Sequence, residues 1–531
     1  MTESLTPTEH PPLELKAVQT NRRVLELIVG ALGAIGLVIS VCVPWIGFHH
    51  TILDFHAFRQ AQTALTAESM LHGSDFLHYQ TPVLGAPWSM PFEFPLYQWL
   101  VANLARVLST PLEETGRVVS IVFFYLCFFP LWSILSHIGL RGRGKIPPLA
   151  MFAVSPLYLF VSRTFMMEST ALFFSLMYAD QVFRLALGAH KRRWQHMVGA
   201  AAFGAVAGLV KVTTFAPYLA LGAGLLALMA WRSRRGGRFE IRAITAAVLL
   251  AILVPVGAVW RWTSFADEVK AGNPITAKLT SHALSEWNYG TAAERLRPKL
   301  YGYLIRDSSN YLGSFVMPAL LVAAWLWLRR RWEWKAVACA LLYALPIAIF
   351  YNLYFVHEYY PYANAIFLLV GMGIMVTSLV EMPGFRAWVG VGILALQMAA
   401  SGVRYWQHYY PIQSTNSPGR PQVAALIDGT TRPTDILLVI GDDWSSAIPY
   451  QTHRRAIMIP GLGSEIQPYA YVWENLPAVI NKAGAENIGA FLACSTYRDD
   501  SHIPDLLREA VMRQPIVHHA DDCDIYERGS N

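Results

Sequence analysis

The sequence predicts a polytopic α-helical membrane protein that ends in a small α/β region. Hydrophobic residues make up 54% of the 531 residues and charged residues only 15%, whereas soluble domains carry roughly 25% charged residues. Apolar runs close to the roughly 20 residues that a bilayer-crossing helix needs recur up to residue 401. Beyond residue 402 the apolar runs become short and alternate with polar stretches, which is typical of strands and helices in a water-exposed region.

The apolar runs give the expected membrane spans. They cover residues 24–45, 94–108, 117–138, 147–162, 168–187, 197–213, 215–231, 242–262, 312–328, 336–352, 362–380 and 386–401. The run 94–108 differs from the others because it is short, follows Glu93 and contains Gln98 and Arg106. These features are typical of a helix that lies along the membrane surface. Without it, we expect about eleven spans.

Basic residues gather in short loops between the runs, as the positive-inside rule describes. The four clusters lie at 141–145, 191–193, 232–238 and 329–335. All four fall on the cytoplasmic side only if the run 94–108 does not cross the membrane. The sequence therefore predicts a cytoplasmic tail 1–23, a membrane region 24–401 and an extracytoplasmic region 402–531. The net charge of +6 then reflects topology rather than a nucleic-acid partner.

The C-terminal region 402–531 is expected to form a small α/β domain. The segments DILLVIG, RAIMIP and NIGAFLAC have strand character, and residues 472–484 and 502–513 have helical periodicity. Asp442 and Asp443 follow the first of these strands, where they either bind a ligand or form a solvated turn. Cys494 and Cys523 form a disulfide if the region lies outside the cytoplasm, or remain two separate thiols.

The predicted threading gathers the polar residues of the membrane region at its outer side. The outer segments are 46–116, 162–168, 211–217, 263–311 and 352–361. Ionisable groups held against a membrane are candidates for function, because carboxylates can act as a general base and Arg or Lys can hold a phosphate. The candidates in or beside these segments are Asp54, Arg59, Glu93, Arg117, Arg163, Glu168, Lys211, His357, Tyr359 and Tyr360.

Several of the candidates also have a purely structural explanation. Arg117 and Lys211 could extend to the interface as lipid-facing cations do, and Glu168 could be a favourable charge in the first turn of a helix. The tyrosines could belong to the aromatic belt, and His357 to the polar interface. What favours a functional site is that the candidates cluster on one side of the membrane.

Several motifs resemble a known fold. They are RQAQTA (59–64), EFPLYQWL (93–100), SRTFMMEST (162–170) and the HEYYPY turn (357–362). Their order resembles the C-type glycosyltransferase (GT-C) fold, and particularly the bacterial glycosyltransferase family 39 relatives of protein O-mannosyltransferases and lipid A aminoarabinose transferases, over about residues 20–400. The resemblance implies an enzyme of the bacterial inner membrane. It would transfer a hexosyl or pentosyl group from a polyprenyl-phosphate carrier to a lipid, glycan or protein acceptor at the outer face.

The resemblance also implies roles for the candidate residues. The expected roles are catalysis for Asp54, Glu93 and Glu168, donor-phosphate binding for Arg59, Arg117, Arg163 and Lys211, and substrate binding for His357, Tyr359 and Tyr360. The sequence departs from the family's pattern in two places. Asp54 is followed by Phe55 rather than by a second acid, and Glu168 stands where the family usually has Asp. The identity of the base therefore stays open between Asp54 and Glu93.

The expected chemistry is direct displacement at the anomeric carbon, with the leaving phosphate neutralised by nearby cations. Such a reaction needs no nucleotide or redox cofactor, and metal dependence stays open. One alternative is a transporter or flippase of lipid-linked sugars, which would spread polar residues through the middle of the membrane. A non-catalytic envelope assembly protein is another. The polar segment 263–311 is either a substrate lid or an ordered loop.

Overall fold

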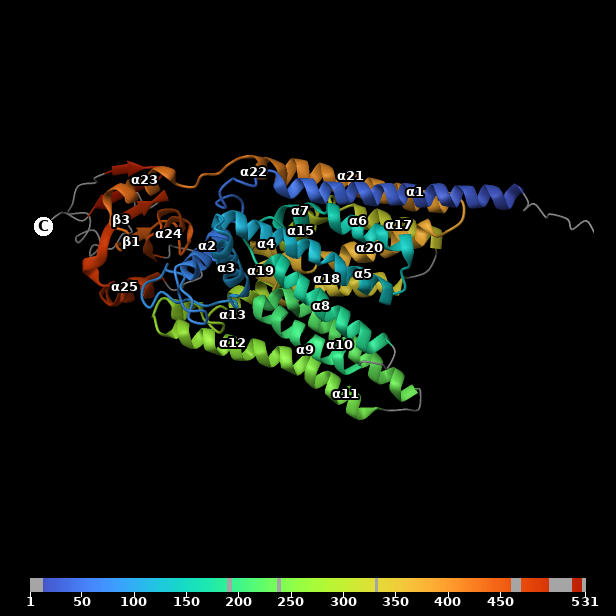
Figure 1. Ribbon diagram of the computed structural model, residues 1–531, viewed down its shortest axis with the longest axis horizontal. Coiled ribbons are helices and arrows are strands. Elements are labelled where there is room, and N and C mark those ends of the chain that lie inside the picture. Colours follow the sequence, from blue (N-terminus) through green and yellow to red (C-terminus); the bar gives the residue numbers. More distant parts are fainter. Residues whose placement is uncertain are drawn as a thin grey trace, which may run out of the picture.

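The computed structural model describes residues 13–188, 193–235, 240–329, 333–459, 469–495 and 518–527. A bundle of helices fills most of the length of the molecule, and a small sheet with its own helices forms one end (Figure 1). Helix α1 runs along the bundle toward the opposite end, so the two ends of the long axis belong to the two ends of the chain. The helix α2, the helix α3 and the loops around them lie between the bundle and the sheet.

The first half of the bundle consists of α1 (Leu13–Cys42), α2 (Ala57–Leu71), α3 (Leu96–Leu108), α4 (Leu112–Leu126), α5 (Phe128–His137), α6 (Ile146–Val154), α7 (Pro156–Val161), α8 (Glu168–Leu187), α9 (Arg193–Val210) and α10 (Val212–Arg235). Helix α1 begins inside the predicted tail 1–23, of which residues 1–12 lie outside the described residues. The predicted run 147–162 is divided at Ser155, whose backbone is extended because a proline follows.

The second half consists of α11 (Ile241–Val248), α12 (Val254–Ala271), α13 (Ser285–Tyr289), α14 (Ala292–Arg295), α15 (Pro298–Asp307), α16 (Ser309–Leu312), α17 (Met317–Arg329), α18 (Trp334–Ile349), α19 (Tyr351–Val356), α20 (Ala365–Val380), α21 (Phe385–Arg404) and α22 (Tyr410–Ser414). Short π-helical segments join α11 to α12 and α21 to α22. The predicted outer segment 263–311 is thus the end of α12 followed by a series of short helices.

The helices make this a multi-pass membrane protein. Among the described residues, five helices are long and apolar enough to cross a membrane, or six if the pair bent by 83° at 313–316 counts as one span. The five are Arg22–Trp45, Leu112–His137, Val212–Arg235, Ile241–Ala271 and Phe385–Ser414. The predicted runs on α8, α9, α18 and α20 are helical without meeting that test, so the figure of about eleven spans stays a prediction.

Helix α3 occupies the run that was expected to lie along the membrane surface. It has 13 residues, which gives a length of about 20 Å at 1.5 Å per residue. That length is well short of the roughly 30 Å of a hydrocarbon core. At the far end of the bundle from the sheet, Arg22, Arg141 and Arg143 line one pocket of about 600 Å³. These basic residues therefore share one end of the molecule, while the side of the membrane that this end faces stays a prediction.

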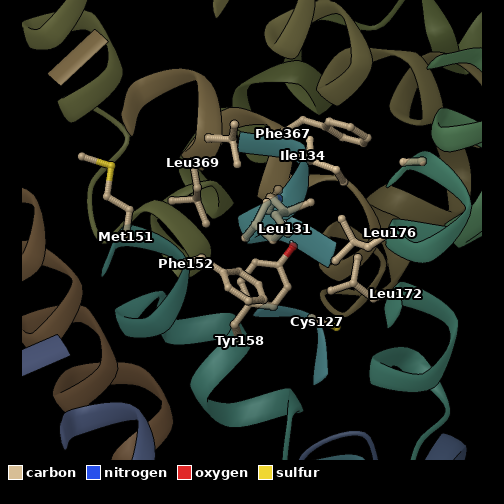
Figure 2. Close-up of a cluster of buried hydrophobic side chains, with 14 of the residues drawn as sticks. Cys127, Leu131, Ile134, Met151, Phe152, Tyr158, Leu172, Leu176, Phe367 and Leu369 are labelled. Atoms are coloured by element: carbon tan, nitrogen blue, oxygen red, sulfur yellow. Dashed lines mark hydrogen bonds between the residues drawn. The ribbon is translucent and has the colours of Figure 1, made fainter. Parts of the chain in front are cut away.

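The main apolar core lies inside the bundle and fixes the turn that carries the late His-Tyr motif. Figure 2 shows Phe152 and Tyr158 beside Leu131, with Leu172 on the neighbouring helix. The Tyr158 hydroxyl donates to the Tyr362 carbonyl at 2.7 Å and accepts from the Ile366 amide at 2.9 Å. A hydroxyl in the core thus satisfies one backbone group of the 357–364 turn and one in the first turn of α20, which would otherwise be buried without partners.

The C-terminal region has one five-stranded sheet in the order β2-β1-β3-β5-β4. Its elements are α23 (Pro421–Thr430), β1 (Ile436–Ile440), α24 (Ala447–Thr452), β2 (Arg455–Ile459), α25 (Tyr469–Ala483), β3 (Ile488–Cys494), β4 (His518–Ala520) and β5 (Cys523–Glu527). The three predicted strands are β1, β2 and β3, which run parallel. The predicted helix 472–484 is α25, and the predicted helix 502–513 lies outside the described residues.

A disulfide joins Cys494 and Cys523, which are register partners on the antiparallel strands β3 and β5. The structure therefore decides between the two alternatives that the sequence left open for these cysteines. Asp442 is not a free solvated residue, because Arg420 Nη1 lies 3.1 Å from its Oδ2. This ion pair ties the start of α23 to the end of β1.

The sheet and the first outer loop share one apolar core. The Ala456 amide donates to the Pro82 carbonyl at 3.0 Å, and the Met458 amide donates to the Val83 carbonyl at 2.8 Å. Residues 82–84 thereby cover the free edge of β2, which would otherwise present unpaired backbone groups. Trp444, just after β1, packs on the rings of Phe58 at 4.9 Å and Phe92 at 5.8 Å. The sheet therefore packs against the residues that directly precede Arg59 and Glu93 in the sequence.

Candidate active site

Two clusters of charged side chains begin at adjacent residues of α2. Successive residues of an α-helix point about 100° apart, so Arg59 and Gln60 face different neighbours. Gln60 bonds to Asp54, and Arg163 and Arg117 lie around that carboxylate; we call these four residues the Asp54 cluster. Arg59 faces Glu93, and beyond it Glu168, Lys211 and the tyrosines of the 357–364 turn, which we call the Lys211 cluster. The structure thus divides the predicted site residues into two groups.

In the Asp54 cluster, both carboxylate oxygens of Asp54 have partners. Gln60 Nε2 donates to Asp54 Oδ1 at 2.5 Å, and Arg163 Nη1 lies 3.5 Å from Asp54 Oδ2. Gln60 Oε1 accepts from the Phe165 amide at 2.9 Å. The side chains of Arg163 and Asp54 are only 1% and 3% exposed. Burial raises the pKa of the Asp54 carboxyl, and the charges of Arg163 and Arg117 act in the opposite direction.

The two arginines of the Asp54 cluster hold the outer loop after α1. Arg117 Nη1 donates to the Gly47 and Phe48 carbonyls at 2.7 and 2.8 Å, and its Nη2 donates to the Thr51 carbonyl at 3.1 Å. Arg163 Nη2 donates to the Gly47 carbonyl at 3.1 Å. The terminal nitrogens that a phosphate would need are therefore engaged with the backbone. The Asp54 cluster is arranged as a clamp on residues 47–54.

In the Lys211 cluster, two ion pairs lie around two aromatic rings. Arg59 pairs with Glu93, and Lys211 pairs with Glu168. The Lys211 ammonium lies 4.9 Å from the centre of the Tyr359 ring and 4.8 Å from that of Tyr360.

Two polar atoms of the ion-paired side chains in the Lys211 cluster form no hydrogen bond. Glu168 Oε2 and Arg59 Nε are buried and have no hydrogen-bond partner among the described residues. Glu93, with 23% of its side chain exposed, is the most accessible member of the two pairs.

Local structure explains why these side chains meet. Glu168 is the first residue of α8, and Lys211 stands at the break between α9 and α10. Both therefore lie at helix ends rather than in the middle of a span. Glu93 is held by its backbone, because the Tyr79 hydroxyl donates to the Glu93 carbonyl at 2.9 Å. The Tyr362 hydroxyl lies 2.8 Å from Ser169 Oγ, which places the tyrosine turn beside the start of α8.

The 357–364 turn adds a stack of rings to the Lys211 cluster. The rings of His357 and Tyr359 lie 5.3 Å apart, and those of Tyr359 and Tyr360 lie 5.0 Å apart. Burial, together with the positive charges of Lys211 and Arg59, lowers the pKa of His357 to about 4. The three residues predicted to bind substrate are therefore brought together with Lys211. The neutral imidazole and the flat rings offer a surface suited to a sugar.

Sequence reasoning missed three residues beside this turn. The His56 ring meets the Tyr359 ring edge to face at 5.1 Å. Glu358 accepts from Asn310 Nδ2 at 3.3 Å and lies 3.3 Å from His408 Nε2. His56 could have been noticed because it stands three residues before the RQAQTA motif. His408 follows the last predicted span and carries no comparable signal.

An apolar pocket lies beside α19, the helix that leads into the turn. It has a volume of about 620 Å³ and is lined by residues of α15, α18 and α19 that include Tyr301, Ile305, Ile347 and Tyr351. Arg295 closes one side, where its Nη1 donates to the Ala348 carbonyl at 2.7 Å. Part of the predicted outer segment 263–311 thus forms a wall of this pocket. Whether the segment moves as a lid stays open.

Comparison with known proteins identifies the fold. No family model matches the sequence, and no curated protein matches it. Among solved structures, ArnT from Cupriavidus metallidurans bound to undecaprenyl phosphate is similar with a TM-score of 0.58 at 12% identity, over 93% of this chain and 97% of that one. ArnT has the GT-C fold. This chain has the GT-C fold too.

Two further GT-C structures are similar to the chain. The archaeal oligosaccharyltransferase AglB from Archaeoglobus fulgidus, in complex with an inhibitory peptide and a dolichol-phosphate, has a TM-score of 0.53 at 10% identity, over 88% of this chain and 69% of that one. The arabinofuranosyltransferase AftD from Mycobacteria has a TM-score of 0.54 at 14% identity, over 95% of this chain and 40% of that one. The GT-C fold that the motifs implied is thereby confirmed.

Among the described residues, no group of three or more His, Cys, Asp or Glu side chains is placed to hold a metal ion.

Proposed function

We propose that the protein is a membrane glycosyltransferase that moves a sugar from a polyprenyl-phosphate carrier to an envelope acceptor. The observation that carries this proposal is the Lys211 cluster, in which the Lys211 ammonium lies over one pair of tyrosines, Arg59 lies near enough to interact electrostatically with the same rings, and each cation pairs with one carboxylate. Such cations can exchange a carboxylate for a phosphate oxygen. Solved proteins of the same fold support the choice of phosphate, because ArnT and AglB were captured with undecaprenyl phosphate and dolichol-phosphate.

The reaction follows from this arrangement. The donor phosphate binds between Lys211 and Arg59, and the sugar lies on the faces of Tyr359 and Tyr360. The acceptor oxygen attacks the anomeric carbon as the bond to the phosphate breaks. Negative charge grows on the leaving phosphate, and cations already in place in a water-poor site stabilise it without reorganising. A phosphate with two cations needs no acid to leave.

The apolar pocket beside α19 supports a lipid-linked donor. Its volume of about 620 Å³ and its lining of leucine, isoleucine, alanine and tyrosine side chains suit a segment of an isoprenoid chain, which gains free energy from burial in proportion to its apolar area. Helix α19 ends at Val356, directly before His357. A carrier lying in this pocket would therefore have its phosphate near the start of the turn.

The geometry favours some predicted roles over others. Arg117 and Arg163 were expected to hold the phosphate, but their terminal nitrogens bind backbone carbonyls and Asp54. We therefore assign phosphate binding to Lys211 and Arg59. Their terminal nitrogens are held by the side chains of Glu168, Glu93 and Gln62, which can move aside for a phosphate more readily than backbone carbonyls can. Asp54, one of the two expected bases, has partners on both oxygens and is assigned to the clamp. Glu93 and Glu168 hold the cations until the donor binds.

The experiment is sugar transfer by the purified protein in nanodiscs with a polyprenyl-phosphate sugar as donor. Lys211→Gln removes one charge-assisted contact to the phosphate, which is worth about 1.5–3 kcal/mol, so kcat/KM for the donor should fall roughly 10- to 150-fold. Lys145→Gln is the matched control, because Lys145 is also a buried lysine but bonds Ser136 at 2.6 Å far from the cluster. Equal transfer by both variants and the wild type would contradict the proposal.

Cells provide the complementary observation. A strain that lacks the protein should accumulate the lipid-linked sugar that serves as donor, and the identity of that lipid would name the sugar. A flippase of the same lipid would also cause accumulation. The purified protein separates the two, because a flippase moves the lipid across the membrane without releasing polyprenyl phosphate.

A further inference from the structure

One pocket lies at the end of the bundle remote from the sheet, and the proposed function gives it no role. It has a volume of about 600 Å³ and lies between the start of α1, the loop 141–145 and the turn from α20 to α21; we call it the Arg141 pocket. Arg22 and Phe385, which both line it, are the first residues of the apolar helices Arg22–Trp45 and Phe385–Ser414, each long enough to cross a membrane. The Arg141 pocket therefore lies where two such helices end, at the level of a membrane surface.

The charged side chains of the Arg141 pocket do not neutralise one another. Arg22 and Arg143 share one carboxylate, because they lie 3.4 and 3.1 Å from the two oxygens of Glu26. The Arg141 side chain has no ion pair or hydrogen bond among the described residues, and neither has that of Glu381. With three arginines and two glutamates, the lining has a net charge of +1. The pocket therefore favours a ligand that carries one negative charge.

The loop that carries two of these arginines is held in place by α20. Thr377 Oγ1 donates to the Gly144 carbonyl at 2.8 Å. Gly144 approaches α20 so closely that a Cβ atom at this position would lie 3.1 Å from Thr377 Cγ2. The positions of Arg141 and Arg143 are therefore fixed by the fold, and the pocket exists before a ligand arrives.

Helices α1 and α21 give the Arg141 pocket an apolar side. Figure 1 shows the two helices side by side, and Leu25 and Val29 of α1 belong to the apolar core between them. Phe385 and Trp388 of α21 also line the pocket, with 58% and 44% of each residue exposed. Aromatic side chains at the ends of membrane helices lie at the level of the lipid headgroups. A molecule that contacts both sides of the pocket therefore has a charged head and an apolar tail.

We propose that the Arg141 pocket binds an anionic phospholipid of the leaflet that this end of the bundle meets. The phosphodiester lies against Arg141 and Arg143, and its single negative charge neutralises the net charge of the lining. Glu381 accepts hydrogen bonds from hydroxyl groups of the head, and the acyl chains run along α1 and α21 past Trp388. Basic pockets between membrane helices are suited to anionic headgroups in this way.

Charge and hydrogen bonding rank the lipids that could occupy the pocket. Phosphatidylglycerol has one negative charge and hydroxyl donors for Glu381. Phosphatidylethanolamine has donors but no net charge, and phosphatidylcholine has neither. Inorganic phosphate has charge but no chains to contact Phe385 and Trp388. We therefore expect phosphatidylglycerol to bind more tightly than each of the other three.

The test is the Kd of each lipid for the full-length protein, measured by native mass spectrometry from detergent. Arg141→Gln should weaken phosphatidylglycerol about fivefold, the contribution of one arginine near an anionic lipid, and should leave phosphatidylcholine unchanged. Arg141 is exposed, so its replacement should not disturb the fold. Arg386→Gln is the matched control. Arg386 follows Phe385 and is also exposed and without an ion pair among the described residues, but it does not line the pocket.

Three results would overturn the lipid site. Equal weakening by Arg141→Gln and Arg386→Gln, or no weakening by either, would mean that the pocket is not what attracts the lipid. Phosphatidylcholine or phosphatidylethanolamine that binds as tightly as phosphatidylglycerol would exclude selection of an anionic head. Inorganic phosphate that displaces the lipid at equal concentration would make the pocket a site for free anions. No donor sugar enters these measurements, so their failure leaves the glycosyltransferase proposal standing.

Discussion

The Asp54 cluster and the Lys211 cluster begin at adjacent residues of α2 and contain the same kinds of side chains, yet they are built differently. The Asp54 cluster has two arginines for one carboxylate, and backbone carbonyls of residues 47–51 accept from their terminal nitrogens, while Arg117 Nε and Arg163 Nε have no partner among the described residues. The Lys211 cluster pairs two cations with two carboxylates. It leaves Glu168 Oε2, Arg59 Nε and His56 Nε2 without partners among the described residues.

The difference separates a cluster whose charges stabilise the fold from a cluster whose charges are available to bind a ligand. A buried charge is costly unless it is paired and hydrogen-bonded, so cations held by backbone carbonyls, as Arg117 and Arg163 are, have little to gain from a ligand. Cations held by side chains, as Lys211 and Arg59 are, can exchange these partners when a ligand arrives. By this criterion a ligand is expected at the Lys211 cluster and stability at the Asp54 cluster. Residue type alone does not distinguish them.

The largest expected effect is on the stability of the clamp. Arg163→Ala leaves Asp54 buried without its paired cation and removes one of the two donors to the Gly47 carbonyl. Breaking a buried pair in this way costs about 3–5 kcal/mol, so the melting temperature in detergent should fall sharply. Arg143→Ala serves as the control, because Arg143 is 52% exposed and also pairs with a carboxylate; its loss should cost less than about 1 kcal/mol. Equal melting of both variants would remove the distinction between the clusters.

A smaller effect is expected where the sheet meets the Lys211 cluster. Trp444→Leu removes ring contacts with Phe58 and Phe92, at about 0.5–1.5 kcal/mol for each aromatic pair. Because these phenylalanines stand next to Arg59 and Glu93, we expect transfer to slow as well. Tyr526→Leu removes a ring contact with Phe491 within the sheet, and it should cost stability without slowing transfer. Slowing by both variants alike would mean that the docking contact has no special role.

The smallest effect concerns a third, more exposed pair. His453 Nδ1 lies 2.6 Å from Glu68 Oε1, and this hydrogen bond to Glu68 raises the pKa of His453. A raised pKa stabilises the folded state below the unfolded value of about 6.5, and this contribution disappears as pH rises through the folded value. With 63% of the His453 side chain exposed, the contribution should stay below about 1 kcal/mol.

Thermal unfolding of the wild type and His453→Gln across this pH range measures the contribution. The two curves should converge above the folded pKa of His453. A gap between them that widens with rising pH would contradict the assignment.

The sequence predicted the fold more completely than the site. Apolar runs, basic loops and the RQAQTA and SRTFMMEST motifs were sufficient for the GT-C fold, because membrane insertion and helix ends are encoded locally. The partners of a side chain are not encoded locally. Arg163, the partner of Asp54, is 109 positions away, and the carbonyl partners of Arg117 are 66 to 70 positions away. The roles of Asp54 as base and of Arg117 as phosphate ligand stay predictions.

Two other features were only partly predictable from the sequence. The cysteines at 494 and 523 were recognised as a possible pair, but only the antiparallel register of β3 and β5 joins them. His56 was visible in the sequence, but nothing there showed that its backbone is left-handed or that its Nε2 lacks a partner. The number of spans and the side of the membrane that each end faces stay predictions.

The central claim is that the Lys211 cluster, rather than the Asp54 cluster, receives the donor phosphate. Equilibrium binding of polyprenyl phosphate to the purified protein in nanodiscs tests it most directly, with Lys211→Gln compared with Arg117→Gln. Glutamine at 117 keeps a donor for the backbone carbonyls, so the folded variant can be isolated. We expect Lys211→Gln to raise Kd roughly 10- to 150-fold and Arg117→Gln to leave it unchanged. A Kd raised by Arg117→Gln and unchanged by Lys211→Gln would contradict the claim.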